Sequence, residues 1–133
     1  MFLLDTNIWI SLLKGRSPLL YERWGSVPSE EIVVCSVVKG ELWHGAHKYL
    51  DPDKRRRTLD SWLAPYDSYA FDDSAARLYA DIKHDLETRA MIIGPNDLKI
   101  AAICLAHDLT LVTSNTAEFA RVRGLRAEDW AKA

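Results

Sequence analysis

The sequence predicts a single α/β domain in which helices pack on a parallel sheet. The chain has 133 residues, 48% hydrophobic and 27% charged, which is typical of one folded domain and excludes intrinsic disorder over most of the chain. Short apolar runs alternate with amphipathic stretches, the pattern of strands and helices in a parallel α/β fold. No repeat, low-complexity tract or linker divides the chain. We therefore expect residues 1–133 to form one domain.

The first elements are expected to be one strand and two short helices. Residues 2–4 are apolar and form the first strand. Residues 7–14 carry apolar side chains at helical spacing, and Gly15 directly after them ends the helix. A Ser-Pro pair then opens a second helix, which extends over residues 18–25, because proline is well tolerated in the first turn.

The middle of the chain is expected to contain one strand followed by two helices. Residues 32–35 form a β-branched, buried strand. Residues 37–49 carry apolar side chains at helical spacing. Asp51-Pro52 opens a further helix, and Pro65 ends it.

The last part of the chain is expected to contain two long helices between short strands. Residues 67–71 form a weak third strand, after which Asp72 caps a helix whose apolar stripe continues to Leu86. Pro95 opens a helix that is apolar on nearly every side over residues 100–106, so it should be deeply buried. A fourth strand over 109–113, a short helix over 116–120 and a fifth strand over 125–127 complete the chain.

Charge, hydropathy and cysteine content exclude several classes of protein. With 17 Lys and Arg against 19 Asp and Glu, the chain is not a polycation that coats nucleic acid, although a local basic patch is allowed. The longest apolar run, residues 100–106, is far shorter than the ~20 residues of a membrane span, and no secretory leader is expected. Cys35 and Cys104 lie in apolar segments, which predicts buried thiols in a reducing compartment, the cytoplasm.

Four acidic residues interrupt apolar surroundings and are the candidate chemical groups: Asp5, Glu41, Asp97 and Glu118. Each also has an ordinary structural explanation. The first fits a helix N-cap, the second a solvated helix residue, the third an acid in a first helical turn, and the fourth an exposed loop acid.

Their positions along the chain are more informative than any one of them. Asp5 and Ser114 follow strands that become neighbours if the strand order reverses between strands one and four. Glu41 and Asp97 lie near the starts of helices expected at the same sheet edge. Converging carboxylates stay ionised only around a cation, and an all-oxygen set suits Mg²⁺ or Mn²⁺ and phosphate chemistry.

Four sequence blocks resemble the PIN domains of VapC toxins. The blocks are LLDTN, VKGELWHGA, IGPNDLKIAA and LVTSNTAEFARVRGLRAEDW, and they cover almost the whole chain in the right order. The resemblance implies a metal-dependent endoribonuclease with a five-stranded parallel sheet of order 3-2-1-4-5 flanked by helices. It further implies the toxin of a type II toxin–antitoxin pair, which cleaves structured RNA, binds a VapB-like antitoxin, and forms a homodimer and a larger assembly with that partner.

The resemblance also assigns roles to the candidate acids. Asp5, Glu41 and Asp97 match the three acidic positions of the family, and Glu118 matches the fourth, where many relatives have Asp. By this analogy Asp5 and Asp97 hold Mg²⁺ (or Mn²⁺), and the two glutamates contribute directly or through water.

Two polar residues match positions that line the same pocket in the family. Thr6 is expected to orient a carboxylate, and Asn115 to help hold Asp5 or the water of the metal.

Two other classes of function stay open at the level of sequence. One is a catalytically silent PIN-like module that only binds RNA or protein. The other is a phosphatase or phosphoacceptor domain of the haloacid-dehalogenase type, which needs a second Asp where this chain has Asn7.

Other patterns are weaker, and most of them also have an ordinary structural explanation. His44 and His47 have the spacing of zinc ligands but also suit an exposed helix face. The run 54–57 with Lys48 could contact phosphate or form a solvated face, and Arg121, Arg123 and Arg126 form a second basic cluster. Trp9 and Trp24 are candidates for a partner surface.

Overall fold

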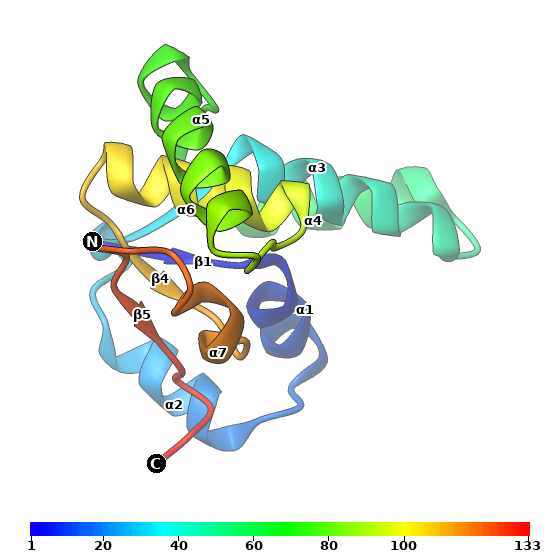
Figure 1. The fold of residues 1–133 in the computed structure, drawn as a ribbon. Coiled ribbons are helices and arrows are strands. Elements are labelled where there is room, and N and C mark those ends of the chain that lie inside the picture. The colour runs from blue at the N-terminus through cyan, green and yellow to red at the C-terminus, as the bar shows by residue number, and fades with distance from the viewer.

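A five-stranded parallel sheet lies at the centre of the computed structural model, which describes residues 1–133 (Figure 1). Its strands are β1 (Phe2–Leu4), β2 (Ile32–Cys35), β3 (Asp67–Tyr69), β4 (Thr110–Val112) and β5 (Ala127–Glu128). Their order is β3-β2-β1-β4-β5, as the resemblance implied. Leu3 of β1 pairs with Val33 on one side and Leu111 on the other, so β1 is the central strand. The chain order reverses at β1 and β4, where parallel sheets bind ligands.

Helices cover both faces of the sheet. They are α1 (Thr6–Lys14), α2 (Pro18–Ser26), α3 (Ser36–Gly45), α4 (Pro52–Leu63), α5 (Asp73–Thr88), α6 (Pro95–Ala106) and α7 (Thr116–Phe119). In Figure 1, α5 and α6 lie above the sheet, whereas α1 and α2 lie below it. Because both faces are covered, β2 is buried at all four positions. None of the helices combines the length and the hydrophobicity that a membrane span requires.

The core is formed by thirty buried apolar side chains on the strands and on the sheet-facing sides of the helices. Helix α6 is buried on nearly every side, and the exposed fraction of its residues from Ile100 to Cys104 does not exceed 1%. This confirms the prediction of a deeply buried helix. Cys35 and Cys104 are both buried free thiols, and burial raises the pKa of Cys35 to about 11.

Several sequence expectations need correction, and the third and fourth strands are shorter than expected, at Asp67–Tyr69 and Thr110–Val112. Trp9 is fully buried, and its ring centroid lies 5.2 Å from that of Tyr66, so it cannot contribute to a partner surface. Trp24 lies half-buried beside Trp62, and its part in a partner surface stays a prediction. The helix expected over 37–49 ends at Gly45 and tightens into a 3₁₀ turn, which is common at a helix C-terminus.

The fifth strand, expected over 125–127, is shifted toward the C-terminus. Gly124 has φ 81°, a left-handed conformation that glycine adopts without strain, and the backbone N–H of Leu125 donates to Val122 at 3.4 Å in the same turn. Leu125 is therefore part of a turn. The strand begins only at Ala127, which pairs with Leu111.

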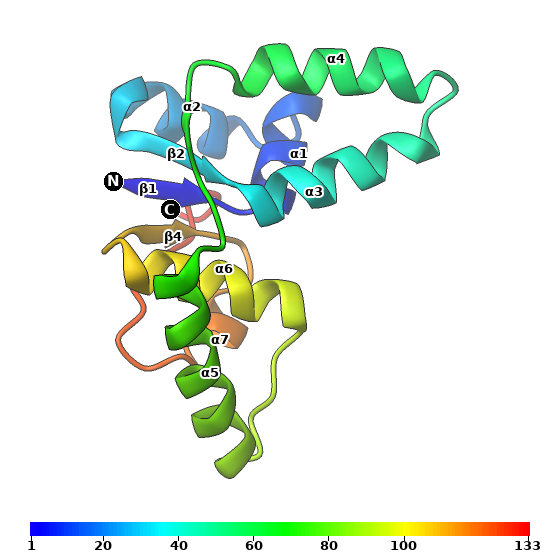
Figure 2. The ribbon, with the colours of Figure 1, turned by 90° about the horizontal axis from the view of Figure 1, so that it is seen from above.

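A hairpin formed by α3 and α4 extends beyond the sheet, as Figure 2 shows. The indole N–H of Trp43 on α3 donates to Asp60 of α4 at 2.9 Å and joins the two helices. At its tip Tyr49 is 40% exposed and Leu50 is fully exposed, so apolar groups face solvent there.

Candidate active site

Asp5 is held where β1 ends, at the centre of the sheet. Its backbone N–H donates to Val112 of the neighbouring β4 at 3.0 Å, so the residue follows the strand pairing. Its carboxylate accepts from the backbone N–H of Ile8 at 3.2 Å and thereby caps α1. The helix-cap explanation is thus correct, but it does not account for the environment, because the residue is only 8% exposed.

The electrostatic surroundings of Asp5 oppose its ionisation. Burial raises its pKa above the usual value, and the charge of Glu41 adds to this. Hydrogen bonds from the Thr113 hydroxyl and from backbone N–H groups partly offset the rise. Thr113 is fully buried at the end of β4, next to the end of β1. Sequence analysis missed it, although a polar residue that ends a buried strand beside Asp5 is a detectable signal.

Glu41 points to the same edge from α3. The Thr6 hydroxyl donates to its Oε1 at 2.7 Å, and the amide of Asn96 lies 3.5 Å from its Oε2. The structure thus places Thr6 on a carboxylate, as the family analogy implied. Asn96 was not among the sequence candidates, although it directly precedes Asp97.

Asp97 lies in the first turn of α6, and its pKa is raised to about 6. Burial is the largest cause, followed by the charges of Glu118, Glu41 and Asp5 and a hydrogen bond with Glu118. A lone acid in a first helical turn is stabilised as an anion by the helix dipole, which would favour the opposite shift. Asp97 therefore belongs to a group of interacting carboxylates.

Glu118 lies in the first turn of α7, and the Asn115 side-chain amide donates to its Oε2. The backbone N–H of Asn115 donates to the Thr113 hydroxyl at 3.0 Å. The link between Asn115 and Asp5 is therefore indirect, because Thr113 lies between the two residues. A side chain that follows β4 by three residues reaches the acid on its own short helix more easily than the buried Asp5. The other expected role of Asn115, toward the water of the metal, stays a prediction.

The four acids form a cluster without compensating positive charge. None of the five ion pairs in the structure includes Asp5, Glu41, Asp97 or Glu118. No three of the side chains stand as a ready-made set of ligands. Their chemistry nevertheless fits a hard divalent cation, because every donor is an oxygen and the charges of Glu118, Glu41 and Asp5 add to the effect of burial in raising the pKa of Asp97.

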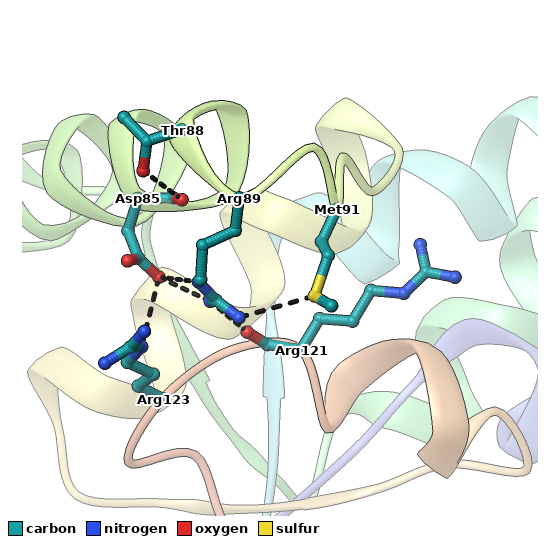
Figure 3. A network of polar contacts seen from close by, with 6 residues as sticks. All are labelled: Asp85, Thr88, Arg89, Met91, Arg121 and Arg123. Carbon is teal, nitrogen blue, oxygen red and sulfur yellow. Dashed lines mark hydrogen bonds and ion pairs between the residues drawn. The ribbon is translucent and has the colours of Figure 1, made fainter.

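A polar network outside the acid cluster connects the end of α5 and the segment before α6 to the segment after α7 (Figure 3). Arg89 at the end of α5 donates to the carboxylate of Asp85 and, at 2.6 Å, to the carbonyl oxygen of Arg121. Arg121 donates in turn to the carbonyl of Ile92 at 3.0 Å, and Arg123 lies 3.6 Å from Asp85. These contacts, chiefly the hydrogen bonds from Arg89, lower the pKa of Asp85. The network fixes the segment before α6 against the segment after α7. Each of these two helices carries a candidate acid in its first turn.

The second basic cluster is therefore engaged within the protein. Arg121 and Arg123 take part in the network, and Arg126 forms an ion pair with Asp108 at 2.9 Å. These contacts favour a structural role over phosphate binding.

The histidine pair does not form a zinc site. The ring centroids of His44 and His47 are 6.3 Å apart, and the guanidinium of Arg56 lies 3.1 Å from His47 Nε2. A guanidinium at that nitrogen competes with a metal ion for the same lone pair, and no further ligand completes a set.

Comparison with known proteins identifies the family. The sequence matches the PIN domain family over residues 2–125. It is 34% identical to the "tRNA(fMet)-specific endonuclease VapC" of Shigella flexneri, over 97% of each chain, and 31% identical to "Ribonuclease VapC2" of Rickettsia felis, over 99% of each. The crystal structure of VapBC2 from Rickettsia felis bound to a promoter DNA fragment superposes with a TM-score of 0.88 at 30% identity, covering 97% of this chain and 98% of that one. The chain therefore belongs to the PIN-domain family, within its VapC group of ribonucleases.

Proposed function

We propose that this chain, as one domain of residues 1–133, hydrolyses phosphodiester bonds in structured RNA with the help of Mg²⁺ or Mn²⁺. One observation carries the proposal: four carboxylates from separate elements interact at one sheet edge, and none is ion-paired. A silent binding module would not need to maintain such a cluster of like charges, which opposes the ionisation of its own members.

The roles of the residues follow from their positions. Asp5 and Asp97 would hold the cation, and Glu41 and Glu118 would contribute directly or through water. Bound there, a divalent cation supplies an activated water and positive charge that faces the phosphate. Thr6 and Asn96 hold Glu41 from two sides, and Thr113 holds Asp5. These hydrogen bonds limit the rotation of the acids before the substrate arrives.

Removal of divalent cations tests the proposed chemistry. We expect the purified protein to cleave a labelled structured RNA with Mg²⁺ or Mn²⁺ and to lose this activity in EDTA, because the carboxylates alone offer no nucleophile activation. Activity should return when either cation is added in excess. Equal cleavage in EDTA and in Mg²⁺ would contradict the proposal.

Replacing Thr6 with valine tests how the cluster is positioned. The substitution keeps the shape of the side chain and removes the hydroxyl that donates to Glu41. We expect the cleavage rate to fall about 10- to 100-fold, as is usual when a hydrogen bond to a metal-site ligand is lost. Thr6→Ser keeps the hydroxyl and should retain most of the activity, whereas equal losses in both variants would argue against this role.

We further propose that a VapB-like antitoxin silences the enzyme in the cytoplasm and that the toxin forms a homodimer within a larger complex. The solved relative is itself a VapBC complex, which supports a partner of this kind. Co-expression with the product of the adjacent upstream open reading frame should yield a stable complex without ribonuclease activity, with a mass above that of one toxin dimer by light scattering. Two proteins that elute separately, at monomer mass, would contradict this.

A further inference from the structure

A groove begins at the acid cluster and continues along the α3–α4 hairpin. Its first part has a volume of about 530 Å³ and is lined by Glu41 of the acid cluster, by Thr6 and by Asn96. A second hollow of about 160 Å³ shares four lining residues with the first, including Glu41 and Lys48, and continues to Tyr49 and Arg55. Because the two hollows have these residues in common, they adjoin, and together their linings extend from Glu41 to Tyr49 at the tip of the hairpin.

The groove concentrates positive charge on a chain whose net charge is −2. Lys14, Lys48 and Arg55 line its second part, and Lys99 lines the first. None of these four cations takes part in an ion pair. Glu41 is the one acidic residue on either lining, so the path is electrostatically suited to a polyanion that reaches the acid cluster.

An aromatic platform lies at the far end of the groove. The guanidinium of Arg55 lies over the Tyr49 ring, 4.3 Å from its centroid, which holds both side chains in place. No other aromatic ring packs on Tyr49, and the residue is 40% exposed. A half-exposed ring beside a row of cations is the combination by which proteins bind single-stranded nucleic acid.

The remaining basic residues do not offer an equivalent path. In the run 54–57, Arg55 faces the groove, whereas Arg56 contacts His47. Arg57 lines a separate hollow next to Trp62, and Lys54 lines both that hollow and one at the hairpin tip beside Tyr49 and Arg55. The arginines near α7 are engaged in the network of Figure 3. Within the basic run, Arg55 therefore lines the groove itself, whereas Arg56 and Arg57 do not.

We propose that a single-stranded segment of the RNA substrate lies in this groove, with its phosphates on Lys14, Lys48 and Arg55 and one base stacked on Tyr49. The inference rests on the proposed ribonuclease function and assigns the residues that bind the substrate beside the cleaved bond. An acidic peptide could use the same cations, but it does not need an aromatic ring positioned for stacking.

Binding of a labelled single-stranded RNA of mixed sequence, measured in EDTA over a range of salt concentrations, tests the charges. Each phosphate contact contributes about 0.7 to the slope of log K against log salt for a single strand. Arg55→Gln should lower this slope by about 0.7, and the double variant Lys48→Gln/Arg55→Gln by about 1.4. Arg55→Lys should keep the slope, and the matched control Arg57→Gln should behave as wild type.

Substitutions of Tyr49 test the stacking. Tyr49→Ala should weaken binding about 5- to 150-fold, the range that corresponds to the loss of one stacked base, whereas Tyr49→Phe and Tyr49→Trp should retain it. Thermal melts of all variants report folding, which these surface substitutions should leave intact.

Cleavage assays of the same variants in Mg²⁺ separate the two proposals. If wild type cleaves RNA and the groove variants bind and cleave as wild type does, the groove assignment is overturned and the proposed function stands. If wild type binds RNA through these residues but does not cleave it in Mg²⁺ or Mn²⁺, the proposed function fails instead. Equal losses in Arg55→Gln and Arg57→Gln, or competition by a poly-glutamate peptide but not by unlabelled RNA, would also overturn the assignment.

Discussion

The Asp97→Asn variant is expected to cleave RNA about 100- to 1,000-fold more slowly than wild type in Mg²⁺. The substitution keeps the shape of the side chain and removes one charge from the carboxylate cluster. Asp97 interacts with all three other acids, so its loss weakens the site for a divalent cation more than the loss of an isolated acid would. Initial cleavage rates across a Mg²⁺ titration measure the effect.

A matched control is available in Asp73→Asn. Asp73 occupies the first turn of α5 as Asp97 occupies the first turn of α6, but it is exposed and is absent from the acid cluster. The control should keep wild-type activity. Equal activities of the Asp97 and Asp73 variants would remove Asp97 from the proposed catalytic group.

Asp5 allows its structural and chemical roles to be separated by two substitutions. Asp5→Asn retains an oxygen that can accept from the backbone N–H of Ile8, whereas Asp5→Ala does not. Both variants should lose RNA cleavage by about 100-fold or more, because neither carries the charge. Only the alanine variant should lose the cap, at a cost of about 0.5–2 kcal/mol in unfolding free energy.

Denaturant unfolding and cleavage assays on both variants distinguish these roles. If the asparagine variant folds as stably as wild type but does not cleave RNA, the carboxylate is needed for chemistry. If it cleaves at the wild-type rate while the alanine variant is unstable and inactive, Asp5 is only a helix cap.

The strands and most helices were predictable because their signals are local. Residues 32–35 carry a run of β-branched side chains, and Gly15, Pro52 and Pro95 mark helix boundaries at or next to the observed positions. Where such signals are weak the boundaries shifted, as in the fifth strand and at the end of α3. The sheet order came from the family resemblance, since no local pattern specifies which strands are neighbours.

The acids could be found from the sequence, but most of their partners could not. Asp5 and Glu41 interrupt apolar segments, and burial of such groups is costly enough to be informative. The hydrogen bonds of Thr113 and Asn96 to these acids join residues that are far apart in sequence, so they depend on how the elements pack. The burial of Trp9 has the same origin, because the ring packs against Tyr66 from another part of the chain.

The pH dependence of Asp97 distinguishes an acid whose charge is opposed by burial and by neighbouring acids from an exposed acid in a first helical turn. Its carboxyl takes up a proton near pH 6 in the folded chain and near 3.8 when unfolded. Between these values the folded state binds more protons, so this residue makes wild type more stable as the pH falls from about 7 to about 4. At about 1.4 kcal/mol per pH unit the upper bound is about 3 kcal/mol, and solvent screening at the open site reduces it to about 1–2 kcal/mol.

The most direct test of the carboxylate cluster is the difference in unfolding free energy between wild type and Asp97→Asn, measured in EDTA from about pH 4 to pH 8. If burial and the charges of the other three acids oppose the ionisation of Asp97, the variant is more stable than wild type by about 1–2 kcal/mol at pH 8, and this advantage disappears toward pH 4. If Asp97 is only an acid in the first turn of α6, the variant is instead less stable by about 0.3–1 kcal/mol at pH 8. That opposite sign would contradict the cluster and the metal-dependent chemistry proposed for it.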